Sequence, residues 1–160
     1  MPAKAPETDD GTLPTDAIAV RTLEQRDLPA IVRIDAASMG RRREEYYAAK
    51  VKATLGEGRL RTSLVAEVDG NVVGFVLAKV FYGEFGQAEP VAVVDSIGVL
   101  PSHRGQHVGA ALFRQLLMNL RALDVERVQT EVDWKQFDLL RFLASHDFRP
   151  APRLCLQLDL

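Results

Sequence analysis

The sequence predicts a single α/β domain in which helices flank one mixed sheet. Short runs of alternating or continuous apolar residues, typical of strands, are interspersed with longer segments of helical periodicity. Their order is strand, helix, helix, three strands, helix, strand, helix, strand, with no repeat and no internal linker. The length of 160 residues suits one domain with one hydrophobic core.

The N-terminal part begins with a segment that we expect to be a flexible tail. Residues 1–16 contain three prolines and four acidic residues, so the domain is expected to cover residues 17–160. Residues 18–23 alternate as a first strand. Asp27 is placed to cap the first helix, whose apolar stripe is Leu28, Ile31, Val32 and Ile34. A second, more polar helix is expected from Arg41 to about Leu55, where Gly56 and Gly58 would end it.

The middle of the chain reads as a hairpin followed by a buried strand. Residues 63–68 and 72–80 are the two hairpin strands, and Asp69-Gly70-Asn71 is the turn between them. Residues 81–90 form a loop. Residues 91–99 are almost all apolar and predict the most buried strand of the sheet.

The C-terminal part predicts two more helices and two more strands. A helix is expected from about Gly105 to Leu123, with Val108, Leu112, Leu116, Leu120 and Leu123 on one face. A strand over 127–132 precedes a helix over 134–145, and a last strand covers about 154–158. In the second helix we expect Phe137, Leu140 and Ala144 to point inward and Trp134 to cover the core.

Composition and charge exclude several classes of function. The net charge of −2 argues against general nucleic-acid binding, which usually needs a basic face. One cysteine, Cys155, allows no internal disulfide, and with only three histidines it predicts no metal site. No apolar run approaches the ~20 residues of a membrane span, and the first residues lack an apolar signal core. We therefore expect a cytoplasmic protein that binds neither membrane nor nucleic acid.

One motif carries chemistry, and it runs from Ile97 to Leu112. A buried strand ends at Val99, a short loop carries Arg104 and Gly105, and a helix with small residues follows. The first turn of a helix has free N–H groups and a positive dipole end, and glycine lets an anion approach the backbone. The stretch therefore predicts an anion cradle, although close packing of a plain strand-turn-helix explains the small residues equally well. The glycine spacing fits neither a P-loop nor a dinucleotide fingerprint.

This stretch resembles the acetyl-CoA motif of the GNAT superfamily of N-acetyltransferases, Arg/Gln-x-x-Gly-x-Gly/Ala. Arg104 and Gly109 match the outer positions, and His107 replaces the first glycine. A histidine there requires a helical, non-glycine backbone, and it could donate a hydrogen bond to phosphate. The element order over residues 17–158 also matches, as does the ending His146-Asp147-Phe148, where the family usually has Leu-Gly-Phe.

The resemblance implies a mostly antiparallel sheet that is split between its central strands, with the pantetheine of acetyl-CoA in the slot. The backbone groups that it assigns to pantetheine belong to Ile97, Gly98 and Val99. The pyrophosphate would lie on the amides of the following turn and helix start: Gly105, Gln106, His107, Val108, Gly109 and Ala110. Gln136 matches an asparagine that often bonds the cofactor. Members of the superfamily are often dimers, so a homodimer is also implied.

Two carboxylates are candidates for handling the proton of the acceptor amine. Glu131 is expected on an apolar strand beside the slot, at the base position of the ribosomal-protein N-terminal acetyltransferase branch, where partial burial would favour a base. Its alternative is an edge-strand residue that faces solvent. Asp95 lies inside an apolar run, beside the expected bulge, and acts either as a base or as a hydrogen-bond partner that fixes the bulge. The two acids could also share a bound water.

The general acid and the acceptor side are less well defined. Many relatives have a tyrosine where this chain has Leu143, so Tyr46, Tyr47 or water would have to protonate the thiolate, and His146 more often caps its helix. The run Arg41-Arg42-Arg43 is partly solvated, or one or two of its members bind a carboxylate. Glu84 and Glu89 either attract a cationic amine or belong to an ordinary polar loop.

The sequence thus predicts an acetyl-CoA-dependent N-acetyltransferase that acts on a primary amine, peptide or small-molecule, by direct attack on the thioester. The alternative is a non-catalytic module of the same fold that binds or senses acyl-CoA. His107 in place of glycine and Leu143 in place of tyrosine motivate that alternative.

Overall fold

The structure is a computed structural model that describes residues 17–56 and 62–160. The predicted tail at 1–16 and Gly58, expected to help end the second helix, lie outside the described residues. Contacts divide the chain into two units, one extending to Thr130 and the other comprising Glu131–Leu160, and each is described by itself.

The first unit contains a sheet with strand order β1-β2-β3-β4-β5. Its strands are β1 (Ala19–Thr22), β2 (Leu64–Val68), β3 (Asn71–Phe81), β4 (Val91–Val99) and β5 (Arg127–Thr130). All neighbours pair antiparallel except β4 and β5, which are parallel. The mixed, mostly antiparallel sheet is therefore confirmed, and β4 has the bounds that the sequence predicts.

The hairpin turn between β2 and β3 is also confirmed. Asp69 and Gly70 have φ of 49° and 74°, and Val68 pairs with Asn71. Two left-handed residues in a two-residue loop make the twist that joins antiparallel strands tightly.

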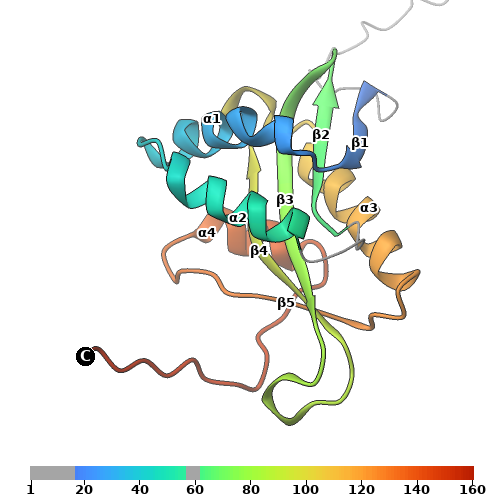
Figure 1. Ribbon diagram of the computed structural model, residues 1–160, viewed down its shortest axis with the longest axis vertical. Helices are drawn as coiled ribbons and strands as arrows, with labels where there is room; N and C mark the ends of the chain where they lie inside the picture. The colour runs from blue at the N-terminus through green and yellow to red at the C-terminus, as the bar shows by residue number, and fades with distance from the viewer. Residues whose placement is uncertain (1–16, 57–61) are drawn as a thin grey trace, which may run out of the picture. The chain divides into compact units, whose positions relative to one another are not determined.

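Helices cover both faces of the sheet. The helices of the first unit are α1 (Leu28–Met39), α2 (Glu44–Gly56) and α3 (Val108–Arg121). On one face, the ring of Phe75 packs edge-on against Tyr47 of α2, in a core cluster that includes Ile34 of α1. On the other face, a Cβ added to Gly74 would lie 2.8 Å from Val108 of α3. The sheet is thus enclosed between α1 and α2 on one side and α3 on the other (Figure 1).

A partly buried ion pair joins α1 to Arg43, the residue before α2. The guanidinium of Arg43 donates to Asp35 from Nε at 2.9 Å and from Nη2 at 2.5 Å, and the Tyr47 hydroxyl donates to the same carboxylate at 2.9 Å. The Arg43 hydrogen bond lowers the pKa of Asp35 below its ordinary value, although burial opposes this. Arg43 therefore binds a carboxylate of its own chain, not that of an acceptor.

Asp27 has the predicted place at the start of α1 but a different role. Its side chain makes no capping hydrogen bond to α1. Instead, its carboxylate accepts two hydrogen bonds from Arg21, each 2.8 Å long, and one from the amide of Glu24. The acid ties β1 to the chain that enters α1.

The second unit differs from the predictions in three respects. Its helix α4 covers Phe137–Ala144, and Leu143 is its buried side chain. Phe137 is 70% exposed, Leu140 is 38% exposed and Ala144 is also exposed, so the predicted inward face is wrong. Trp134, expected over the core, is 90% exposed. Eight residues form only two turns, too few for apolar periodicity to define which face is buried.

The predicted last strand is the third difference. Residues 154–158 have no ladder partner among the described residues, although their alternation is that of a strand. Alternation predicts a strand only where a neighbouring strand supplies the hydrogen bonds.

Candidate functional site

Strand β4 has a bulge in its middle, and Asp95 is the extra residue. On β3, consecutive residues Leu77 and Ala78 pair with Ser96 and Val94, so Asp95 has no partner of its own. The pairing of β4 with β5 ends at the same point, where Val94 is opposite Thr130. Bulges bend a strand and end pairing locally, so this bulge separates the paired half of β4 from the rest.

Beyond the bulge, β4 has a neighbour on one side only among the described residues. Its last four residues, Ser96 to Val99, pair with Leu77, Val76, Phe75 and Gly74 of β3. The backbone groups of Ile97 and Val99 that point away from β3 are not used by β5. The three residues that the resemblance assigns to pantetheine therefore lie on a sheet edge that β5 leaves free.

Gly98 has a packing role as well. A Cβ added there would lie 2.7 Å from the ring of Phe75 and 3.1 Å from Ile34 of α1. Real Cβ atoms do not approach other atoms this closely, so a larger residue would displace the aromatic ring or the strand.

The turn between β4 and α3 has the backbone of an anion-binding concavity. Gly105 and His107 both have left-handed backbones, with φ of 74° and 66°. The expectation that His107 needs a helical backbone is wrong, because it adopts the conformation that glycine favours. The first helical hydrogen bond of α3 runs from Ala111 to the carbonyl of His107, so the preceding amides are those of a helix N-terminus. Left-handed residues in such a turn direct successive N–H groups to one side.

Arg104 is held beside this turn by α1. Its Nη2 donates to Ser38 Oγ at 2.8 Å, and both side chains are exposed. Gln106 reaches back to the carbonyl of Ser102 at 3.5 Å. Arg104, Gly105 and the N-terminus of α3 thus lie together in the structure. Val108, which is 1% exposed, fixes the start of the helix against the core.

Asp95 does not stand alone at the bulge. Lys50 of α2 donates to its carboxylate at 2.7 Å, and Ser96 donates to it at 3.1 Å. The side chains of Lys50 and Asp95 are 27% and 36% exposed. Burial lowers the pKa of the Lys50 ammonium, but Asp95 and Tyr46 together raise it by more, so the net shift is upward. Lys50 therefore stays charged beside the acid.

Lys50 is not among the residues predicted from the sequence, and its only sequence signal is the spacing to Tyr46. The Tyr46 ring lies one helical turn earlier, with Lys50 Nζ 4.9 Å from its centre and Arg43 at the same distance. Tyr46 is 43% exposed. An aromatic residue and a cation four residues apart in sequence lie on the same face of a helix and can contact each other.

The second unit carries the other two predicted site residues. Glu131 is exposed and follows the end of β5, because that strand stops at Thr130 and does not reach residue 132. The expected place on a partly buried strand is therefore wrong, although its catalytic role remains a prediction. Gln136 is the exposed N-cap residue of α4.

The candidates for a general acid differ in their surroundings. Leu143, at the position where many relatives have a tyrosine, is 5% exposed and has no proton to donate. Burial, and after it the Asp35 carboxylate, raises the pKa of the Tyr47 hydroxyl well above its ordinary value. The Tyr47 hydroxyl therefore belongs to the hydrogen-bonded group of Asp35 and Arg43 and is a poor proton donor. His146 interacts through Nδ1 with the carbonyl of Phe142 at 2.9 Å, which agrees with its predicted capping role.

The remaining polar candidates are solvated. Arg41 and Arg42 are exposed, and Arg42 has a long contact of 3.6 Å with Glu44. Glu84 and Glu89 lie exposed in the loop between β3 and β4. Within residues 17–56 and 62–160, no group of three histidine, cysteine or acidic side chains could hold a metal. No helix in the same ranges is long and apolar enough to cross a membrane.

Comparisons with known proteins agree with this geometry. Among curated proteins, an uncharacterized N-acetyltransferase from Archaeoglobus fulgidus is 30% identical over 86 residues. The match covers 54% of this chain, and the chain spans only 58% of the length of that relative.

Solved structures show the same fold at low sequence identity. Aminoglycoside N-acetyltransferase AAC(6')-Iy, in complex with CoA, has a TM-score of 0.74 at 17% identity, covering 89% of this chain and 94% of its own. Ribosomal-protein-alanine N-acetyltransferase from Brucella melitensis biovar Abortus 2308 has a TM-score of 0.70 at 23% identity, covering 90% of this chain and all of its own (100%). A transcriptional regulator from Bacillus halodurans C-125 has a TM-score of 0.74 at 19% identity, covering 89% and 99%.

The profile of the acetyltransferase (GNAT) family matches residues 20–148, which include the bulge, the free edge of β4 and the turn before α3. The chain therefore belongs to the acetyltransferase (GNAT) family.

Proposed function

We propose that the protein transfers an acetyl group from acetyl-CoA to a primary amine. The observation that carries this proposal is the position at which the sheet divides. The last β4–β5 pair is Val94 with Thr130, and the residue that follows each of these along the chain is an acid, Asp95 and Glu131. The free edge of β4 then leads directly to the turn at Arg104–His107.

The residues of the first unit suit the two ends of acetyl-CoA. An extended edge supplies alternating N–H and C=O groups, which suits the amide-bearing pantetheine arm. A helix N-terminus, left-handed turn residues and an arginine suit a pyrophosphate. We assign the arm to Ile97, Gly98 and Val99, and the phosphates to Arg104 and to residues 105–110. Gln136 is a further proposed contact, from α4.

The reaction forms one bond and breaks one. The neutral amine attacks the thioester carbonyl, the new N–C bond forms, the C–S bond breaks and CoA leaves as the thiol or thiolate. A backbone N–H of the β4 edge would stabilise the developing oxyanion. The proton that the amine loses passes to Asp95 or Glu131, directly or through water.

The need for a base depends on the amine. A lysine-type amine of pKa ~10.4 costs roughly 4.6 kcal/mol to deprotonate at pH 7, whereas an α-amine near 7.8 costs about 1 kcal/mol. Both a peptide or protein amine and a small-molecule amine fit the proposal. The solved relatives include an aminoglycoside acetyltransferase and a ribosomal-protein-alanine acetyltransferase, so both acceptor types occur among proteins of this fold.

Thermal unfolding with acetyl-CoA tests the donor site first. Ligand at about 100 times its Kd should stabilise the protein by ~2.7 kcal/mol, which raises Tm by several degrees. Arg104→Ala should reduce this rise. Arg114→Ala removes the same charge from an exposed position of α3 and is the matched control.

Release of CoA thiol with a panel of amines then separates the two candidate functions. Turnover with an amine supports the transferase. A rise of Tm without turnover on any amine favours the acyl-CoA-binding module. No rise of Tm with acetyl-CoA contradicts both.

A further inference from the structure

The ion pair of Lys50 and Asp95 occupies a carboxylate that the proposed reaction needs. The lysine ammonium lies 2.7 Å from each of the two oxygens of Asp95, so it spans the whole carboxylate. Asp95 is the unpaired residue of the β4 bulge and one of the two candidate bases. An amine that approaches Asp95 therefore meets a cation that is already bound there, and the two positive charges repel each other.

The pair can be reached and opened from solvent. Both side chains are partly exposed, and so is Tyr46, whose ring contacts Lys50. Partly exposed ion pairs contribute little net free energy, so a ligand that supplies both charges can replace this one. All three residues belong to the first unit.

The face of α2 around Lys50 carries no replacement for Asp95. The residues three and four positions from Lys50, which share its face of the helix, are Tyr46, Tyr47, Ala53 and Thr54. None of these is an acid. Asp35 of α1 is already bound by Arg43 and Tyr47. When an amine takes Asp95, the counter-charge that Lys50 loses is therefore restored most directly by a carboxylate on the acceptor itself.

We propose that the acceptor carries a carboxylate close to its amine, and that these two groups exchange partners with the ion pair: the amine binds Asp95 and the carboxylate binds Lys50. This inference rests on the proposed acetyl transfer and names its class of acceptor. The four charges then alternate in sign, so each keeps a counter-charge. A free amino acid supplies both groups through its own carboxylate, and a peptide supplies them when an acidic residue follows the N-terminal residue.

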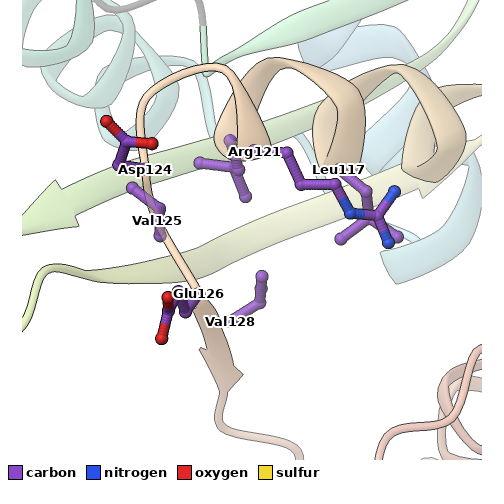
Figure 2. A pocket seen from close by; sticks show the side chains of 7 residues that line it. Leu117, Arg121, Asp124, Val125, Glu126 and Val128 are labelled. Atoms are coloured by element: carbon purple, nitrogen blue, oxygen red, sulfur yellow. The ribbon is translucent and has the colours of Figure 1, made fainter.

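A hollow elsewhere in the first unit is not part of this arrangement. It has a volume of about 400 Å³ and lies between α3, the turn that follows it and β5, where its lining includes Leu117, Arg121, Asp124, Val125, Glu126 and Val128 (Figure 2). Lys50, Tyr46 and Asp95 do not line it, and neither does the turn before α3. The exchange of partners therefore takes place at the exposed bulge and needs no enclosed cavity.

Matched acceptors with and without the carboxylate test the exchange. Alanine is compared with alaninamide, and the peptide amide of alanine followed by aspartate is compared with that of alanine followed by asparagine. Calorimetric titrations at neutral pH, with saturating CoA and without it, measure binding separately from turnover. In at least one pair we expect the carboxylate member to bind about tenfold or more tightly, as a hydrogen bond between charged groups allows.

The pair that shows this preference identifies the source of the carboxylate, a free amino acid or an acidic second residue of a peptide. No preference in either pair, the absence of binding by all four compounds included, overturns the proposal. Tighter binding of the amides overturns it as well.

Variants of Lys50 test whether this residue is the partner of the carboxylate. Lys50→Met should abolish the preference, so that the carboxylate and amide members bind alike. Lys50→Arg keeps the cation and should keep the preference. Lys52→Met removes a positive charge from an exposed position of the same helix and should also keep it. A preference that survives in Lys50→Met overturns the proposal.

Release of CoA thiol with the same four compounds separates this inference from the proposed function. Turnover of the amides as efficient as that of the carboxylate compounds overturns the inference and leaves the transferase in place. Turnover of none of them, together with the binding preference, contradicts the transferase, whereas the exchange of partners at Lys50 and Asp95 stands.

Discussion

The ammonium of Lys50 lies 2.7 Å from the carboxylate of Asp95, the extra residue at the β4 bulge. The lysine comes from α2 and the acid from β4, so this pair connects α2 to the point where the pairing of β4 with β5 ends. A cationic acceptor that approaches Asp95 has to compete with Lys50 for the carboxylate.

Lys50→Met should therefore increase the affinity for cationic acceptors. Partly exposed ion pairs are worth ~0.2–1 kcal/mol, so we expect KM for the amine to fall by up to about fivefold, with the effect weakened by salt. Lys52→Met, an exposed lysine on the same helix, is the matched control. An unchanged or increased KM in the Lys50 variant would show that the lysine positions Asp95 instead of competing with the substrate.

Glu131→Gln should reduce turnover at least tenfold, because the amide cannot accept the amine proton. The Tm rise with acetyl-CoA should remain as in the wild-type protein. The deficit should be larger for a lysine-type amine than for an α-amine, which loses its proton more easily. Full activity at every pH would remove Glu131 from the mechanism and leave Asp95, tested in the same way by Asp95→Asn.

His107→Gly should keep or strengthen acetyl-CoA binding, because glycine adopts the left-handed backbone of this turn without strain. His107→Val should weaken it, since a β-branched residue at positive φ is strained by roughly 1–2 kcal/mol and would rearrange the turn. The Kd of each variant, measured by calorimetry, checks this order. Weaker binding by the glycine variant would instead indicate that the imidazole contacts the phosphates.

Gly98→Ala should destabilise the fold by about 1–3 kcal/mol, since the new methyl group would lie 2.7 Å from the Phe75 ring. Gly56→Ala is the control, because a Cβ there meets nothing within 4 Å. Urea unfolding of both variants gives the comparison. Equal stabilities would mean that β4 shifts without cost.

Asp35→Asn should cost about 3 kcal/mol at neutral pH, because it leaves the Arg43 guanidinium without its buried counter-charge. The pKa of Asp35 is lowered from 3.8 in the folded protein, so the stability that its charge contributes is present above pH 3.8 and is lost as pH falls through the lower folded value. The difference in the free energy of unfolding between wild type and variant should therefore be constant near neutral pH and become smaller in acid. Arg42→Ala, at an exposed arginine, should cost little at any pH.

The sequence by itself determined the elements of the first unit and the place of the proposed donor site. Strands β2, β3 and β4 alternate or run apolar because they are half or fully buried, and the hairpin turn needs residues that tolerate positive φ. The strand-turn-helix motif from Ile97 to Ala110 is contiguous, so its chemistry could be read without any knowledge of tertiary contacts.

Tertiary structure alone decided which side chains meet. Lys50 and Asp95 are 45 residues apart, and only the packing of α2 on the sheet brings them to 2.7 Å. Asp35 and Arg43 form an ion pair, so Arg43 is no longer a candidate for substrate binding. Which side chain of α4 is buried, and whether residues 154–158 form a strand, could not be predicted from the sequence, because each depends on a neighbouring segment. In α4 Leu143 is buried and Phe137 is exposed, and residues 154–158 have the pattern of a strand but no ladder partner among the described residues. A residue pattern shows which surface a segment can bury and which strand it can pair with. Burial and pairing stabilise the protein only where a partner surface or strand is present.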